Sequence, residues 1–339
     1  MIVLGAGFSV VAGHPVMADF ATVVTTLATD PHTPLREDER ERFRRVLEYR
    51  SSLQRLYGFL YLDLDNVEHL FGLLDMESSL SPGVSGALPR EDLIFVLVKT
   101  LELTYRIAPE LNEKLAQYKR GGSLQAIREI RRTESRHPSR SYYEFVQALR
   151  PHDIILTFNY DTVLEDALLA AGIGPHYVTG EPAWSGISRT QSVLKLHGSV
   201  NFIESKNGDV SFVDFELLEK TTDRYYEQGQ PLLVPPTWNK TSPSPLIQQI
   251  WTEASRALER ASRLVFIGYS LPETDLFFRY LLANALVHNE ILQAVSVLDP
   301  AQQTRERYAS FVSEALRNQG KFQAIDNVFQ NAWREGLGV

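Results

Sequence analysis

Short apolar runs rich in β-branched residues alternate with helix-like segments along the second half of the chain. Because strands joined through helices run parallel, this alternation is typical of a parallel sheet with helices on both faces. The N-terminal region fits the same scheme: an apolar run from Met1 to Leu4 enters a glycine turn, and Pro15 suits the first turn of a helix through Leu27. We therefore predict an α/β protein with a Rossmann-like parallel sheet. Its expected strands in the second half are 153–158, 193–197, 232–234, 263–268 and 294–299.

The segment between the first strand and these later strands is helical in pattern and lacks a convincing strand. A chain of 339 residues suits about two domains, or one large domain with an insertion. We predict a first βα unit at 1–35, a helical insertion at 36–150 and the remainder of the Rossmann-like core at 151–339. Within the insertion, the run LIFVLVKTLELTYRI is apolar enough for either a core or an oligomer interface.

Composition excludes several classes of protein and site. The net charge of -8 argues against a surface built to neutralise phosphates, so direct binding of nucleic acid is not expected. The absence of cysteine excludes disulfides, thiolate zinc sites, iron–sulfur clusters and a cysteine nucleophile. The eight histidines form no HExxH pair, and we predict no metal site.

The apolar N-terminal stretch is not expected to be a targeting signal. It has no Lys or Arg before Arg36, whereas a signal peptide needs a positive first region, and glycines interrupt it. No later stretch approaches the about 18 apolar residues of a membrane span. We predict a cytoplasmic protein that does not enter a membrane.

Polar or glycine-rich residues directly follow four of the predicted strands. They lie in the strings GAGFS, NYD, HGS and GYSLPETD, and an aspartate ends a fifth strand. Ligands of open parallel sheets bind at the carboxyl ends of the strands, where these residues would converge. The candidate site residues are Gly5, Ala6, Gly7, Ser9, Asn159, Asp161, His197, Gly268, Tyr269, Ser270 and Asp299.

These strings together resemble the motifs of the sirtuin-like NAD-consuming fold. The string GAGFSVVAGHP resembles its GAGxSxxAGxP signature, and TFNYD at 157–161 looks like its TQNxD motif. Leu196-His197-Gly198 looks like the catalytic His-Gly of the family, GYSL at 268–271 like its GTSL, and VLDP at 297–300 like the strand end near the adenosine ribose. The motifs follow the family order.

The resemblance implies that NAD is the substrate and that its glycosidic bond is cleaved. By analogy, Asn159 would orient the water or the ribose hydroxyls, Asp161 would hold the nicotinamide carboxamide and His197 would act as general base. The glycine turn after the first strand and the Gly268–Ser270 loop would approach the phosphates. Asp299 would accept from the adenosine ribose hydroxyls.

Each of these residues also has a structural interpretation, which the sequence leaves open. Asn159 or Asp161 stands where a helix must begin and would serve as its N-cap, and Asp299 would look the same before the next helix. A single histidine at a strand end is often structural. The arginine run of Arg128, Arg131, Arg132, Arg136 and Arg140 suits a solvated helical face or an acidic partner, and Trp238 suits a lid or a core anchor.

Two departures from the sirtuin pattern bear on the reaction. Deacylating sirtuins carry a four-cysteine zinc module, whereas residues 205–230 are polar and acidic. The arginine of the cofactor loop is also missing, since the chain reads GHPVMA at 13–18. The strings KLHGSVNF and IGYSLPETD resemble instead the zinc-free NAD hydrolase domains of bacterial antiphage defence. That resemblance implies an NAD glycohydrolase that works as a homo-oligomer or beside a translocase ATPase; the alternatives are an NAD-dependent protein deacylase and a non-enzymatic NAD or ADP-ribose sensor.

Overall fold

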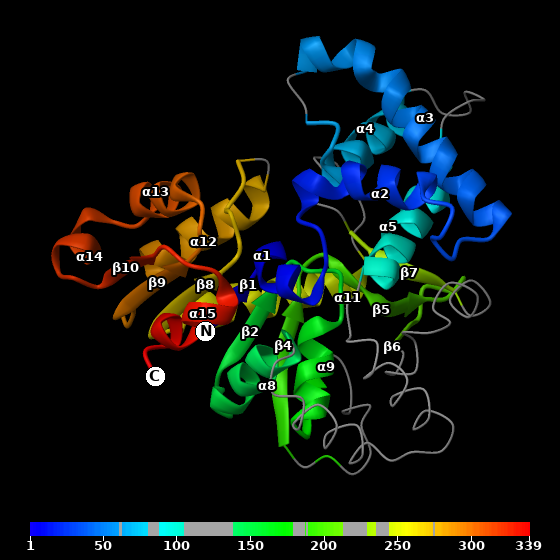
Figure 1. The fold of residues 1–339 in the computed structure, drawn as a ribbon. Helices are drawn as coiled ribbons and strands as arrows, with labels where there is room; N and C mark the ends of the chain where they lie inside the picture. Colours follow the sequence, from blue (N-terminus) through cyan, green and yellow to red (C-terminus); the bar gives the residue numbers. More distant parts are fainter. Residues whose placement is uncertain are drawn as a thin grey trace.

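The computed structural model describes residues 1–60, 63–80, 88–104, 138–178, 187, 189–212, 229–234, 244–273 and 275–339. Its centre is a sheet of seven strands whose pairings are all parallel (Figure 1). This confirms the predicted Rossmann-like α/β class. In spatial order the strands are β10 (Phe322–Ile325), β9 (Ala294–Leu298), β8 (Arg263–Ile267), β1 (Ile2–Leu4), β2 (Ile154–Thr157), β4 (Arg189–Lys195) and β3 (Ile173–His176).

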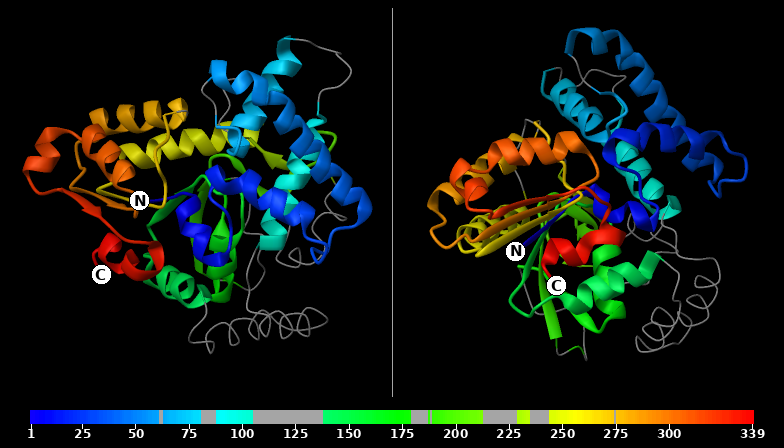
Figure 2. Two further views of the ribbon diagram at one scale, coloured as in Figure 1. Left: turned by 45° about the horizontal axis from the view of Figure 1, so that its top comes forward. Right: turned by 60° about the vertical axis from the view of Figure 1, so that its left-hand side comes forward.

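Helices cover both faces of this sheet, as the two views of Figure 2 show. The central strands are buried on both faces, which explains why they read as continuous apolar runs rather than as alternating patterns. One face carries α11 (Pro245–Glu259), α12 (Leu276–His288) and α13 (Gln302–Phe311), and α14 (Glu314–Asn318) follows them. The other face carries α8 (Pro138–Ala148), α9 (Val163–Ala170) and α15 (Phe329–Leu337).

A second, antiparallel sheet follows the His-Gly string. It has the order β6 (Val210–Phe212), β5 (Gly198–Glu204), β7 (Gln230–Leu233). The predicted strand at 232–234 therefore belongs to this sheet and not to the parallel one, which corrects the sequence-based assignment. The chain leaves β4, turns at Gly198 with a φ of 76°, and returns as β5, so no crossover helix separates the two strands.

The predicted helix through Leu27 is broken into several short pieces. They are α1 (Ala6–Ser9), the 3₁₀ turns Val10–Ala12 and Met17–Asp19, and α2 (Phe20–Thr29). Pro15 lies between these pieces and not in the first turn of a helix, which corrects the expectation. Gly13, in the left-handed region with a φ of 103°, ends the first 3₁₀ turn.

The helices of the insertion form a second hydrophobic cluster beside the sheet. They are α3 (Glu37–Leu60), α4 (Val67–Leu80) and α5 (Arg90–Thr104). Their cluster includes Phe20 and Val24 from α2, and Val200, Ile203 and Leu233 from the antiparallel sheet. The apolar run of α5 is buried in this cluster, so its described part is a core element of the chain. Figure 1 shows these helices gathered above the antiparallel sheet.

In the described residues, no single helix is long and apolar enough to cross a membrane. One pair of helices bent by 63°, Ala6–Ala12 with Met17–Thr29, passes the same test on length and composition together.

Candidate active site at the carboxyl edge of the sheet

The predicted site residues all follow the carboxyl ends of five neighbouring strands. β9, β8, β1, β2 and β4 are adjacent in the sheet and parallel, so the residues after them share one edge. Segments 294 residues apart in sequence therefore meet, from Gly5 after β1 to Asp299 after β9. The structure brings these residues to one edge, and their roles toward a ligand remain predictions.

The glycines of the first loop pack directly against the loop after β8. A Cβ on Gly7 would lie 2.7 Å from the Cα of Gly268, and one on Gly5 would lie 2.5 Å from the Gly268 carbonyl oxygen. The Gly7 N–H donates to that carbonyl at 2.9 Å, and the Gly5 N–H donates to Ile267 at 3.0 Å. Backbone contact between the two loops therefore already requires glycine, and these two N–H groups are engaged within the protein.

Asn159 joins the first loop to the second strand. Its side-chain amide nitrogen donates to the carbonyl oxygen of Gly5 at 2.9 Å and to the Ser9 hydroxyl at 3.0 Å. Both amide hydrogens are thereby used, and the side-chain oxygen remains as an acceptor. Asn159 is half-buried at this edge and does not cap α9.

The sequence left open whether Asn159 or Asp161 caps the helix that follows. In the structure Asp161 makes the capping-type hydrogen bond. Its Oδ1 accepts from the backbone N–H of Val163 at 3.0 Å, in the turn that begins α9. Its backbone carbonyl accepts from the ammonium of Lys195 at 2.5 Å. Asp161 is thus fixed from two sides, and its second carboxylate oxygen is not used by that turn.

A buried ion pair lies behind Asp161. The Nζ of Lys195 lies 2.9 Å from Oε1 of Glu165, with side chains 1% and 4% exposed. The Tyr177 hydroxyl donates to the same carboxylate oxygen at 3.2 Å. The sequence analysis missed this pair, although a lysine inside an apolar strand, VLKLH, is a signal that could have found it.

The imidazole of His197 lies among aromatic rings. Its centroid is 5.2 Å from that of Phe158 in an edge contact, 6.2 Å from that of Tyr160 and 6.5 Å from that of Trp251. His197 is 2% exposed. The Trp251 indole donates to the carbonyl oxygen of Leu196 at 3.0 Å, which ties α11 to this strand end. Trp238, the lid candidate, lies outside the described residues.

The GYSLPETD string is partly a structural device. The ring of Tyr269 stacks on Phe158 at 3.9 Å between centroids, and its hydroxyl donates to Oδ2 of Asp275 at 2.6 Å. The other oxygen of Asp275 accepts from the Phe278 N–H at 3.2 Å and caps α12. Ser270 is exposed, and its carbonyl accepts from the guanidinium of Arg307. Arg307 is a cation at this loop that the sequence analysis did not single out.

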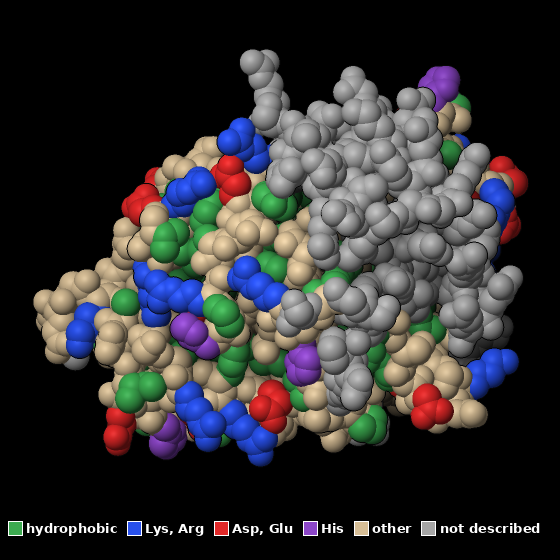
Figure 3. Space-filling view, turned by 90° about the horizontal axis from the view of Figure 1, so that it is seen from below, with side chains coloured by type: hydrophobic (Ala, Val, Ile, Leu, Met, Phe, Trp, Pro, Cys, Tyr) green, Lys and Arg blue, Asp and Glu red, His purple; other side chains and the backbone are tan. Residues whose placement is uncertain are grey.

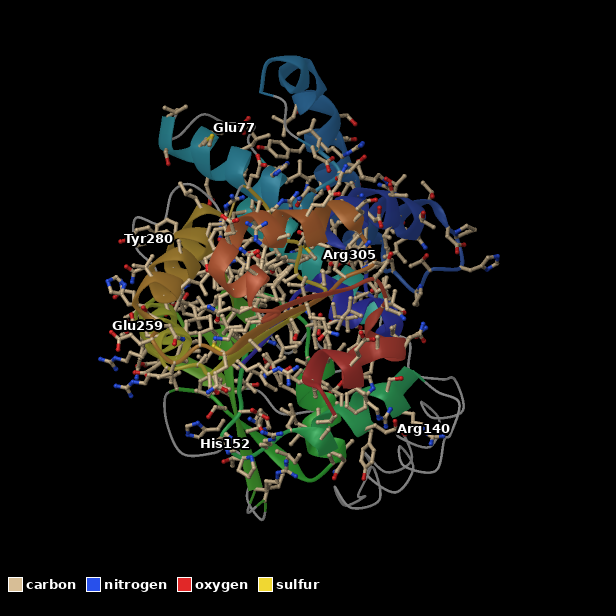
Figure 4. All side chains as sticks on the ribbon, turned by 90° about the vertical axis from the view of Figure 1, so that its left-hand side faces the viewer. Glu77, Arg140, His152, Glu259, Tyr280 and Arg305 are labelled. Atoms are coloured by element: carbon tan, nitrogen blue, oxygen red, sulfur yellow. The ribbon has the colours of Figure 1, made fainter. Side chains whose placement is uncertain are left out.

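Asp299 forms an Asx-type turn before α13. Its Oδ1 accepts from the N–H of Ala301 at 2.8 Å, and its carbonyl accepts from Arg305 at 2.8 Å. Burial raises the pKa of the Asp299 carboxyl above its ordinary value. Figure 4 labels Arg305 on the α13 side of the sheet.

The helical insertion adds a carboxylate near the site. Burial, followed by the charge of Asp275, raises the pKa of Glu68 on α4 to about 8. Burial also raises the pKa of Tyr160, and the charge of Glu68 adds to that effect. The Tyr160 hydroxyl is buried and has no hydrogen-bond partner among the described residues. No signal in the sequence of α4 pointed to Glu68.

Two further predictions concern other parts of the chain. Arg128, Arg131, Arg132 and Arg136 lie outside the described residues. Arg140 lies on α8 with its side chain 57% exposed and pairs with Glu144 at 2.8 Å (Figure 4). Within the described residues, no group of three or more His, Asp or Glu side chains is placed to hold a metal ion.

Comparison with known proteins gives a family match for part of the chain. A family model described as the SIR2-like domain matches residues 153–310, the span that carries Asn159, His197 and Asp299. This match confirms the sirtuin-like part of the resemblance. A solved structure titled "Structural Basis for the Mechanism and Regulation of Sir2 Enzymes" aligns at 13% identity, covers 68% of this chain and 83% of that chain, and has a TM-score of 0.36. No curated protein has a significant match to the chain.

Proposed function

We propose that the protein is an NAD glycohydrolase, which cleaves NAD to nicotinamide and ADP-ribose. The observation that carries the proposal is that Asn159, Asp161 and His197 lie with the two glycine loops at one edge of the parallel sheet. Residues 153–310 of the chain, which include these three residues, match a SIR2-like domain. That edge is where open parallel sheets bind nucleotides. The absence of cysteine supports hydrolysis over deacylation, because the thiolate zinc module of deacylating sirtuins has no counterpart.

The proposed reaction breaks the bond between C1′ of the ribose and the nicotinamide nitrogen. The bond electrons leave with nicotinamide, and water adds to C1′ and loses a proton. Positive charge develops on the ribose as the bond breaks, so a nearby dipole or carboxylate lowers the barrier. The side-chain oxygen of Asn159 suits this position, because both amide hydrogens are held by the first loop and the oxygen alone is left to accept from water or a ribose hydroxyl.

We propose the remaining roles by analogy with the sirtuin motifs. His197 would take the proton of the attacking water, and the carboxylate oxygen of Asp161 not used by the turn would accept from the nicotinamide carboxamide. The Tyr160 hydroxyl, buried without a partner among the described residues, offers a further polar contact. Near the Ser270 loop, the guanidinium of Arg307 would face the diphosphate and supply the positive charge that the altered cofactor loop lacks.

We further propose that this activity depletes NAD during bacterial antiphage defence. The strings KLHGSVNF and IGYSLPETD support this setting by their resemblance to the zinc-free hydrolase domains of such systems. The proposal includes a homo-oligomer and a translocase ATPase as partner. Measuring the size of the purified protein tests the homo-oligomer. Phage challenge of cells that carry wild-type or Asn159→Ala protein, with cellular NAD measured in parallel, tests the role in defence.

The enzymatic test follows NAD by chromatography, with and without an acetylated peptide. The proposal expects nicotinamide and ADP-ribose without peptide, and a loss of at least about a hundredfold in rate in Asn159→Ala and in His197→Ala. Matched controls are Asn331→Ala and His288→Ala, which change the same residue types at exposed positions. Melting temperatures show whether each variant is folded.

Two outcomes would replace the proposal. Turnover only with peptide, with an acetylated ADP-ribose as product, would assign a deacylase. A sensor would be assigned if the oligomeric protein binds NAD without turnover and if this binding is unchanged in both site variants.

A further inference from the structure

A cavity lies at the edge of the parallel sheet opposite the proposed NAD edge. Its volume is about 870 Å³, within the range of small-molecule sites. Residues at or just before the starts of β2 and β8, such as Asp153 and Arg263, line it. Because these strands are parallel, the cavity faces away from the edge that carries Asn159 and Gly268. Figure 3 views this side of the molecule, on which Lys, Arg and His side chains gather, and Figure 4 labels His152 just before β2.

The lining of this cavity is basic, although the chain as a whole is acidic. Among the described residues, the acidic side chains that line it are those of Asp153 and Glu253, two fewer than the four arginines. The chain has a net charge of -8, so this local excess is not a property of its general surface. The basic lining residues are Arg150, His152, His176, Arg256, Arg260 and Arg263.

The arginines of the cavity differ in how they are engaged. Arg263 donates to the carbonyl oxygens of Leu337 and Gly336, and Arg256 pairs with Glu253 at 2.6 Å. The guanidinium groups of Arg150 and Arg260 have no hydrogen-bond or ion-pair partner among the described residues. Exposed arginines without a partner are common, but here two line the same cavity with two histidines. Guanidinium groups suit phosphate oxygens, which they can bind bidentately.

Apolar residues complete the cavity between the charged groups. Several of them belong to the strands and to the segment after β3, and two of these, Leu194 and Val265, are buried. A cavity with both an apolar wall and guanidinium groups suits a ligand that has a ring system as well as a phosphate. The apolar lining residues of the strands and of that segment are Ile2, Ile154, Val178, Leu194 and Val265.

We propose that this cavity binds a phosphorylated small molecule of nucleotide size, with Arg150 and Arg260 on the phosphate and the apolar wall against the ring. The site is separate from the proposed NAD edge. Binding here would therefore leave the NAD edge free. The proposal stands whether or not the protein hydrolyses NAD.

Calorimetric titration of the full chain with ADP tests the proposal, with adenosine as the probe that lacks phosphate. An Arg150→Ala/Arg260→Ala variant should weaken one ADP binding event at least about tenfold. Because these side chains have no partner among the described residues, the melting temperature of the variant without ligand should stay within about 2 °C of wild type. A matched control, Arg36→Ala/Arg44→Ala, removes the same charge from exposed positions just before and within α3 and should leave ADP affinity within about twofold.

The NAD edge supplies the remaining control, because ADP is also part of NAD. ADP binding at the cavity, which the Arg150→Ala/Arg260→Ala variant weakens, should persist in Asp299→Ala. Wild-type affinity and stoichiometry in the arginine variant would overturn the proposal, as would loss of all ADP binding in Asp299→Ala alone. Equal binding of adenosine and ADP would also overturn it, and so would no binding of ADP or of inorganic pyrophosphate at millimolar concentration.

Discussion

Replacing Lys195 with methionine should destabilise the protein strongly while keeping the volume of the strand. The Lys195 ammonium lies 2.9 Å from Oε1 of Glu165, and both side chains are at most 4% exposed. The substitution leaves the Glu165 carboxylate buried with the Tyr177 hydroxyl as its remaining donor. Breaking a buried pair from one side costs about 3–5 kcal/mol, because the remaining charge is neither solvated nor paired. The free energy of unfolding should fall by this amount.

The double variant Lys195→Met/Glu165→Met separates the charge effect from lost packing. With both charges removed, the remaining cost is about 1–3 kcal/mol each for the unsatisfied Asp161 carbonyl and Tyr177 hydroxyl, and the carbonyl is already unsatisfied in Lys195→Met. The double variant should therefore be no less stable than Lys195→Met, and the coupling energy of the pair should exceed about 2 kcal/mol. Urea unfolding followed by both circular dichroism and tryptophan fluorescence gives the free energies and tests two-state behaviour.

An exposed pair supplies the control for this measurement. Arg256 and Glu253 approach to 2.6 Å, but their side chains are 60% and 38% exposed. Arg256→Met should cost less than about 1 kcal/mol, because water solvates the carboxylate that remains. If Lys195→Met also costs less than about 1 kcal/mol, or if the two single variants are additive, burial does not decide the strength of the Lys195 pair and the reasoning is wrong.

Three further predictions concern the loops and the insertion. Gly268→Ala should lower the free energy of unfolding in urea by more than about 2 kcal/mol, because a Cβ would meet backbone at 2.5 Å at a φ of 61°. Gly320→Ala, with a φ of 69° and no atom within 4 Å of the added Cβ, should lower it by only about 1 kcal/mol. Equal losses would contradict this account. The pKa of Glu68 is raised from 4.5 to about 8, so the folded state binds this proton more tightly than the unfolded state does. The stability that results is complete below pH 4.5 and is lost as the pH rises through 8. The melting temperature of Glu68→Gln should therefore gain on that of wild type across this range, and parallel curves would refute the shift. Tyr269→Phe should cost about 1.5–3 kcal/mol in urea unfolding by removing a hydrogen bond to a buried carboxylate, while Tyr280→Phe, 71% exposed, should be neutral; a neutral Tyr269→Phe would show that this hydrogen bond is weak.

The strands at the centre of the parallel sheet could be predicted because both of their faces are buried. β2, β8 and β9 are buried, so each is a run of mostly β-branched and aliphatic residues. β3 and β10 were not predicted, for two different reasons. β3 contains Gly174 and Pro175, which break a strand pattern, and β10 is half-exposed at the edge.

The convergence of the site residues could be predicted, but their hydrogen bonds could not. Parallel strands place their carboxyl ends together, so Asn159 and His197 had to share an edge with the first loop. The choice of Asp161 over Asn159 for the turn into α9 depends on side-chain directions that residue types do not fix. Glu68 could not be found, because only packing of the insertion brings it near Asp275.

The residues of the matching motifs divide into those that build the edge and those left to meet a ligand. Gly7 and Gly268 pack backbone against backbone, and Tyr269 is fixed through Asp275, so these residues would be needed in a folded chain without any ligand. Substituting them tests folding before it tests binding. Asn159 differs, because its amide hydrogens hold the first loop while its side-chain oxygen remains available. Asn159→Asp tests this division: it removes the two donors and keeps an acceptor, so it should loosen the loop and lower the melting temperature, whereas a role confined to the ligand would leave the melting temperature unchanged.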